Sequence, residues 1–205
     1  MNKLAKPLPI DREINLDPNQ TLLSKVSAIG TILYANDYFI EVSGYEEWEL
    51  MGQSDIVLQH PNIPIVVYKW IQESVQRGEN KPALLKSISK DGRYFWTLTH
   101  FETKFDSNGV VEAVITRQKA APQDAVIRIE ELYKVLKSIE MKQNPGASEK
   151  YFFGFLEEYG LTYDSFILKI LNIDAKTLHN YFFPPKVATT TIQEEKPGFF
   201  SKYFS

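Results

Sequence analysis

Residues 31–53 read TILYANDYFIEVSGYEEWELMGQ, and this stretch decides the fold. The apolar residues Ile32 and Tyr34 predict a short strand that ends at Asn36. Asparagine is a preferred helix N-cap, so a short helix is expected to begin there and to stop at Gly44. The stretch therefore predicts a strand followed directly by short helices.

The flanking residues extend this pattern to a full sheet. Upstream, residues 21–27 alternate and lead into a glycine turn, which predicts another strand. Downstream, residues 63–78 have helical apolar spacing, and residues 83–89, 94–105 and 110–117 are expected to be strands. This order predicts an α+β fold, in which a five-stranded antiparallel sheet carries helices on one face and a C-terminal helical extension follows. The strand over residues 94–105 alternates Tyr94, Trp96, Leu98 and His100 with Phe95, Thr97, Thr99 and Phe101.

A second apolar region follows the sheet. Residues 124–142 carry apolar side chains at steps of three and four. This spacing predicts one long helix that either packs on the sheet or pairs with a copy of itself. The sequence Asn144-Pro145-Gly146 is expected to end it. Three shorter helices are expected over residues 148–159, 163–171 and 174–182.

Shifts in composition divide the chain into five parts. The parts are an N-terminal arm over residues 1–20, the sheet domain over 21–118, a connecting helix over 123–143, a small helical unit over 148–183 and a flexible tail over 184–205. The tail ends in the aromatic sequence GFFSKYFS, which is either a peptide that docks on a partner or a frayed end.

Composition excludes several classes of protein. The 205 residues include no cysteine, which excludes disulfides, thiolate metal sites and cysteinyl cofactor adducts. The net charge is −3, which gives no overall attraction for nucleic acid or an anionic membrane. No apolar run approaches the roughly 20 residues of a transmembrane helix, and a cytoplasmic location is expected. No nucleophile–base pair, phosphate loop or metal motif is present, so we do not expect an enzyme.

Three separated motifs carry a family resemblance. They are residues 31–53, the sequence QHPNIP at 59–64 and the sequence SISKDGRYFW at 87–96. In this order they resemble a PAS domain of the aerotaxis-receptor type, a sensor family of bacterial energy and redox taxis. The resemblance covers residues 21–118 and implies helices that enclose a cavity against a five-stranded sheet. It also implies non-covalent FAD in that cavity, held by apolar walls and a few polar groups.

The resemblance implies a set of cofactor-binding residues. Asn36, His60 and Trp96 match the family motifs, whereas Gln59 and Asn62 stand where the family has arginine and aspartate. Lys81 lies near the position of a family tryptophan. The candidate contacts are Asn36, Gln59, His60, Asn62, Trp70 and Trp96.

Each candidate also has a structural interpretation. Asn36 is a helix N-cap, His60 a loop residue at a helix end, and Trp70 and Trp96 are core residues. Because Gln59, Asn62 and Lys81 depart from the family pattern, a cofactor-free PAS scaffold or dimerisation module stays open as an alternative.

The absence of an output enzyme predicts signalling by contact. The helix over residues 123–143 is expected to relay the state of the cavity to a separate chemoreceptor-type or other signalling protein, or to a second copy of the chain. Membrane contact is expected only through such a partner. Residues 166–182 faintly resemble part of a helix-turn-helix, which leaves a DNA-binding regulator as a further alternative. Residues 148–183 carry three lysines against five acidic residues, so we expect no nucleic-acid partner.

Overall fold

The computed structural model describes residues 4–184, and the predicted aromatic tail end therefore lies outside the described residues. Five strands form one antiparallel sheet in the order β2-β1-β5-β4-β3. The expected α+β fold class is confirmed, with five antiparallel strands and a C-terminal helical extension. The strands are β1 (Leu22–Ser27), β2 (Ile32–Ala35), β3 (Pro82–Ile88), β4 (Tyr94–Phe105) and β5 (Val111–Ala120).

Short helices connect β2 to β3 and cover the first face of the sheet. They are α1 (Asp37–Ser43), α2 (Glu47–Leu50), the 3-10 helix η1 (Asp55–Leu58) and α3 (Ile65–Gln76). Asn36 begins α1, as expected, because its side chain accepts a hydrogen bond from the Phe39 amide at 3.1 Å. Leu22, Phe39, Leu50 and Phe95 belong to the apolar core between this face and its helices.

Strand β4 has the predicted alternation, and its two faces enter different cores. Phe95 packs with residues of β1 and α1, whereas Trp96 and Leu98 pack with residues of the C-terminal helices. Thr97 and Thr99 share the face of Phe95, and their hydroxyl groups lie 3.0 Å apart. The sheet therefore separates two apolar compartments.

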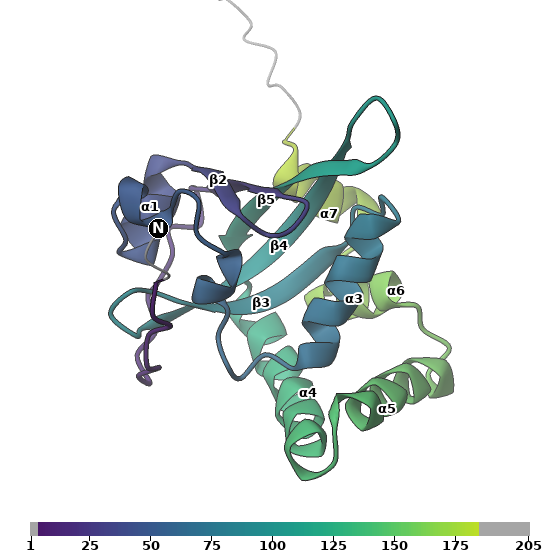
Figure 1. Cartoon of the computed structure of the whole chain (residues 1–205). Coiled ribbons are helices and arrows are strands. Elements are labelled where there is room, and N and C mark those ends of the chain that lie inside the picture. The colour runs from purple at the N-terminus through teal and green to yellow at the C-terminus, as the bar shows by residue number, and fades with distance from the viewer. Residues whose placement is uncertain (1–3, 185–205) are drawn as a thin grey trace, which may run out of the picture.

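Four C-terminal helices follow the sheet, and the first, third and fourth of them contact its second face. They are α4 (Gln123–Lys142), α5 (Pro145–Glu158), α6 (Tyr163–Leu171) and α7 (Ala175–Phe182). Figure 1 shows α6 and α7 behind the sheet, with α3 on the near side. The Tyr133 hydroxyl of α4 donates to the Leu84 carbonyl of β3 at 2.9 Å, and the Tyr181 hydroxyl of α7 donates to the Ala120 carbonyl of β5 at 2.9 Å. Of the two expectations for the apolar stripe of α4, packing on the sheet is the one observed.

One helix boundary differs from expectation. Residues 144–146 were expected only to end the preceding helix, but α5 begins at Pro145. The Asn144 side chain caps α5 by accepting the Ala147 amide at 3.0 Å. Proline is favoured in the first turn because its missing N–H would have no intrahelical partner there. The three residues therefore end one helix and start the next.

The described part of the N-terminal arm runs beside the β3–β4 hairpin. The Ile10 amide donates to the Gly92 carbonyl at 2.8 Å, and the Tyr94 amide donates to the Arg12 carbonyl at 3.0 Å. Gly92 has a φ of 89°, and a Cβ there would lie 2.3 Å from the Leu8 carbonyl oxygen. Only glycine permits this approach. Within residues 4–184, no helix has the length and apolar character needed to cross a bilayer.

Candidate functional site: a cavity on the first face of the sheet

A cavity of about 570 Å³ lies between the first face of the sheet and the helices η1 and α3. Its volume falls in the range of ordinary small-molecule sites, roughly 300–1,000 Å³. The sheet contributes the alternate residues Phe95, Thr99 and Phe101 of β4, and α3 contributes Tyr68 and Ile71 among others. The cavity thus uses the face of β4 that points away from the C-terminal helices.

The walls of the cavity are apolar, and polar groups interrupt them at a few points. The apolar walls include Ile32, Phe39, Leu58, Ile71, Val75, Phe95, Phe101 and Val114. Amide side chains come from Gln59, Gln72, Gln76 and Gln118, and hydroxyl groups come from Ser24, Ser27, Tyr68, Ser87, Thr99 and Thr116. Such a lining suits a flat, largely apolar ligand with hydrogen-bonding groups at its edge. None of the described lining residues is a lysine or an arginine.

Asp55 is the one carboxylate among the described lining residues. It is the first residue of η1, and its amide donates to the Gly30 carbonyl at 2.9 Å. Burial raises the pKa of its carboxyl to about 6, against a smaller lowering effect of a hydrogen bond from the Ile56 backbone. Gly30 makes room for this side chain, because a Cβ at Gly30 would lie 2.9 Å from an Asp55 oxygen.

The six predicted contact residues do not lie together. Gln59 lines the cavity. Asn62 and Trp96 line a second pocket beneath α4. The remaining three residues, Asn36, His60 and Trp70, line neither space.

Those three residues have structural partners. Besides capping α1, the Asn36 side chain accepts the Leu23 amide at 3.0 Å and donates to the Thr21 carbonyl at 2.9 Å. Trp70 stacks on Tyr163 of α6. Their roles as cofactor contacts remain predictions.

His60 is buried in the loop that precedes α3. Its Nδ1 accepts the Asn62 amide at 3.1 Å, and its ring meets the Tyr94 ring edge-on at 6.0 Å. Burial is the main reason that its pKa falls to about 4, and the positive charges of Lys86 and Lys6 lower it further. At neutral pH the imidazole is therefore neutral and accepts a hydrogen bond within the loop.

Sequence reasoning missed Asp55, Gln72, Thr116 and Gln118 as lining residues. The alternation of side chains along β4 was sufficient to predict that Thr99 lies on the same face of the sheet as Phe95. Gln118 lies on β5 opposite Thr99, so the pairing of these two strands was the additional information required. For Asp55 no local signal existed, because its burial depends on the approach of η1 to the Gly30 turn.

The strand order, the connecting helices and the enclosed cavity together form a fold of the PAS/LOV type. No protein-family model matches the chain. Among curated proteins, it is similar to the Aerotaxis receptor of Escherichia coli (strain K12), with 26% identity over 132 residues, which are 64% of this chain and 26% of the receptor. It is also similar to Phototropin-2 of Oryza sativa subsp. japonica, with 27% identity over 84 residues, which are 41% of this chain and 9% of that protein.

Two solved structures are similar to this chain over about half of its length. One is a light-oxygen-voltage domain studied with a flavin analogue, with a TM-score of 0.48, 25% identity and coverage of 55% of this chain and 87% of that one. The other is the Aureochrome1 LOV domain in its light state, with a TM-score of 0.49, 22% identity and coverage of 55% and 91%. Of the curated relatives, the chain covers only part of the length: 26% of the aerotaxis receptor and 9% of the phototropin.

Proposed function

We propose that the protein is a non-enzymatic PAS-type sensor or adaptor for redox or energy signals, and that its cavity binds a flavin non-covalently. The observation that carries this proposal is the cavity of about 570 Å³ with apolar walls and amide groups. The similarity to an aerotaxis receptor supports a role in taxis, and the similarity to a LOV domain studied with a flavin analogue supports a flavin.

The lining residues fit the ring system of a flavin better than its phosphates. Phe39, Ile71 and Phe95 offer apolar surface to a flat ring, and Gln59 and Gln118 offer amide groups to its polar edge. No cationic side chain is among the described lining residues, so a phosphate would need partners outside the cavity. A bound flavin would supply reversible electron transfer.

The role of Asp55 in this proposal is to hold or release a proton within the cavity. Its pKa of about 6 lies close to neutrality, so a change in the charge of the cavity would change its protonation. The protonation change would alter hydrogen bonding next to Gly30 and the β1–β2 turn. Such a local change can bias a packed element between two arrangements.

We further propose that the sheet and α4 pass this change to a chemoreceptor-type signalling partner or to a second copy of the chain. Strand β4 contacts the cavity through Thr99 and the C-terminal helices through Trp96 and Leu98. A shift in β4 would therefore act on α4 directly. The proposed location is cytoplasmic, and the proposal includes no nucleic-acid partner.

The test is the absorption spectrum of the purified full-length chain, followed by denaturation and mass analysis of any released flavin. FAD, FMN and riboflavin are distinguished by mass. We expect Gln118→Leu to lower the flavin content, because it keeps the size of the side chain and removes the amide. Gln123→Leu changes an exposed residue and serves as the control.

The flavin part of the proposal fails if the protein is colourless and takes up none of the three flavins after refolding. The second candidate function, a cofactor-free PAS scaffold or dimerisation module, would then be preferred. The cavity lining without a lysine or arginine among the described residues favours that alternative. Its test is the oligomeric state of the unliganded chain by light scattering.

A further inference from the structure

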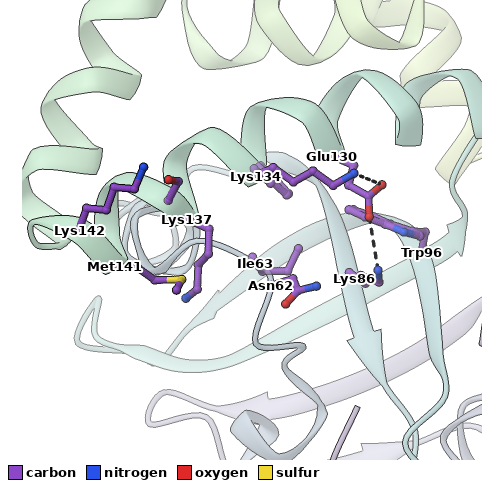
Figure 2. Close-up of a pocket in the computed structure, with 11 residues that line it drawn as sticks. Asn62, Ile63, Lys86, Trp96, Glu130, Lys134, Lys137, Met141 and Lys142 are labelled. Atoms are coloured by element: carbon purple, nitrogen blue, oxygen red, sulfur yellow. Dashed lines mark hydrogen bonds and ion pairs between the residues drawn. The ribbon is translucent and has the colours of Figure 1, made fainter. Parts of the chain in front are cut away.

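A second pocket lies on the opposite side of the sheet from the cavity that we propose binds a flavin. Its volume is about 320 Å³, and it is bounded by α4, by β3 and β4, and by the loop before α3. Figure 2 shows Glu130, Lys134, Lys137, Met141 and Lys142 extending from α4, with Lys86 and Trp96 on the strands and Asn62 and Ile63 on the loop. Three separate parts of the chain therefore form this pocket.

The pocket is strongly cationic. Its lining contains four lysines, Lys86, Lys134, Lys137 and Lys142, and one carboxylate, Glu130. Glu130 is shared, since one oxygen lies 3.4 Å from the Lys86 ammonium and the other lies 3.2 Å from that of Lys134. Among the lining residues, one carboxylate thus pairs with two lysines, and Glu13 also lies close enough to Lys86 for their charges to attract.

The other two lysines add further positive charge. Lys137 pairs with Glu140 at 3.2 Å, but the second oxygen of Glu140 is already engaged by the Val66 amide at 3.2 Å. For Lys142 no ion pair is found within residues 4–184. Burial lowers the pKa of Lys6, and the nearby positive charge of Lys137 lowers it further.

The base of the pocket is apolar and aromatic. Trp96 is 5% exposed and stacks near Tyr133, with ring centroids 6.3 Å apart and planes at 24°. Ile63 lies beside them, and Met141 is an exposed apolar side chain at the opening. Asn62 and Ser138 supply neutral hydrogen-bonding groups. A ligand here needs both a flat apolar part and negative charge.

The spacing of the lysines indicates how the negative charge of a ligand would have to be distributed. Lys134 and Lys142 are eight residues apart on α4, which separates them by about 12 Å along the helix axis and about 80° around it. A single phosphate or carboxylate cannot reach both ends of this row. The positive charge therefore suits a ligand that carries its negative charge on two or more linked groups.

The geometry points to a binding site for a nucleoside diphosphate or a closely similar organic polyanion, with its ring against Trp96 and Ile63 and its phosphates along the lysine row of α4. The site is separate from the flavin cavity and shares no lining residue with it. Because its lining comes from both α4 and the strands, the bound nucleotide would hold α4 against the sheet. It would thus give the protein a second input besides the state of the cavity.

The test is calorimetric titration of the full-length chain with ADP, with pyrophosphate and adenosine as the two halves of the ligand. We expect ADP to bind more tightly than either half, and to bind less tightly as salt increases. The variant Lys134→Gln/Lys142→Gln leaves the Lys137–Glu140 and Lys86–Glu130 pairs in place, and we expect each substitution to weaken ADP binding by about tenfold. Lys150→Gln removes an exposed lysine of α5 and should leave binding unchanged.

Two results would overturn the proposal. One is the absence of ADP binding up to about 1 mM, the upper end of ordinary small-molecule affinities. The other is ADP binding that the double variant retains or that Lys150→Gln weakens equally, which would place the nucleotide elsewhere. Circular dichroism of each variant controls for unfolding. A protein that is colourless, takes up no flavin after refolding and binds ADP would refute the flavin proposal and leave this one intact.

Discussion

Trp70 of α3 stacks on Tyr163 of α6, with ring centroids 3.6 Å apart and an angle of 26° between the planes. Both rings are buried in the apolar core that also contains Leu84, Trp96 and Leu98 of the sheet. The same helix α3 lines the cavity through Tyr68 and Ile71. The C-terminal helices therefore share one core with the PAS sheet.

We expect this shared core to unfold in one step. Tyr163→Ala should lower the free energy of unfolding by about 3–5 kcal/mol, because it leaves a cavity beneath Trp70. Tyr163→Phe keeps the ring and should cost less than about 1.5 kcal/mol. Urea unfolding followed by tryptophan fluorescence and by circular dichroism measures both. Two separate transitions would show that the C-terminal helices unfold independently.

The ion pair between Lys86 and Glu130 gives a second prediction. The Lys86 side chain is 6% exposed, and its ammonium lies 3.7 Å from the centre of the Tyr94 ring. Glu130→Gln should cost about 1–3 kcal/mol, because it removes the carboxylate that is paired with a buried ammonium.

A double variant tests the cause of this loss. Lys86→Met combined with Glu130→Leu should recover most of the stability, since replacing a whole buried pair by apolar residues is often neutral. Lys134→Gln removes the exposed partner of the same glutamate and should cost less than about 1 kcal/mol. Equal losses from Glu130→Gln and Lys134→Gln would contradict the proposed importance of burial.

Asp55 should make stability fall with rising pH. Its pKa of about 6 is above the ordinary value of 3.8, so the folded protein binds this proton more tightly than the unfolded chain does. Its contribution is therefore full below about pH 4 and is lost as pH rises to about 6. Asp55→Asn should gain about 2–3 kcal/mol relative to the wild type across that interval. Urea unfolding at pH 4 and pH 7 measures the gain, and Asp11→Asn, at an exposed aspartate, is the control.

His60 should make stability fall as pH decreases, which is the opposite of the effect of Asp55. Its pKa of about 4 lies below the ordinary value of 6.5, so the unfolded chain binds the proton first as pH falls. Stability should decrease from about pH 6.5 to pH 4, by up to roughly 3 kcal/mol. His60→Gln should abolish this part of the pH dependence, whereas His179→Gln, at an exposed histidine, should leave it intact. Unfolding curves for the two variants at several pH values separate this effect from that of Asp55.

Asn36 should contribute to stability in the absence of any cofactor. Asn36→Ala removes three hydrogen bonds, to Phe39, Leu23 and Thr21, and should cost about 2–3 kcal/mol. Asn36→Asp keeps both acceptor interactions and should cost about 1 kcal/mol. Thermal unfolding of the flavin-free protein gives both values. A neutral Asn36→Ala would contradict this structural role of the three hydrogen bonds.

The elements that could be predicted from sequence are those determined by local pattern. The alternation in β4 predicted which residues share a face, and Asn36 was correctly expected to cap α1. The helix over residues 124–142 matched its observed bounds to within one residue at the start. These features depend on neighbours along the chain, so their signals are contained in short windows.

The features that could not be predicted depend on contacts between distant segments. Nothing near Asp55 indicates that its carboxyl would be buried beside Gly30. The partner of Trp70 lies on α6, which is 93 residues further along the chain, as the positions of Trp70 and Tyr163 show. Lys81, near the position of a family tryptophan, forms an ion pair with Asp164 of α6. In each case a side chain of ordinary local character acquires its role from tertiary packing.

Strand β4 lies between the two apolar cores, so its residues can report separately on changes in each core. Thr97 and Thr99 face one side and Trp96 and Leu98 face the other, so neighbouring residues on a single strand sample different surroundings. Isotope labels on alternate residues of this strand would thus tell an experimenter which side a ligand has entered. By the same geometry, inserting or deleting one residue in β4 would exchange its threonines with its tryptophan and leucine, and disturb both sides together.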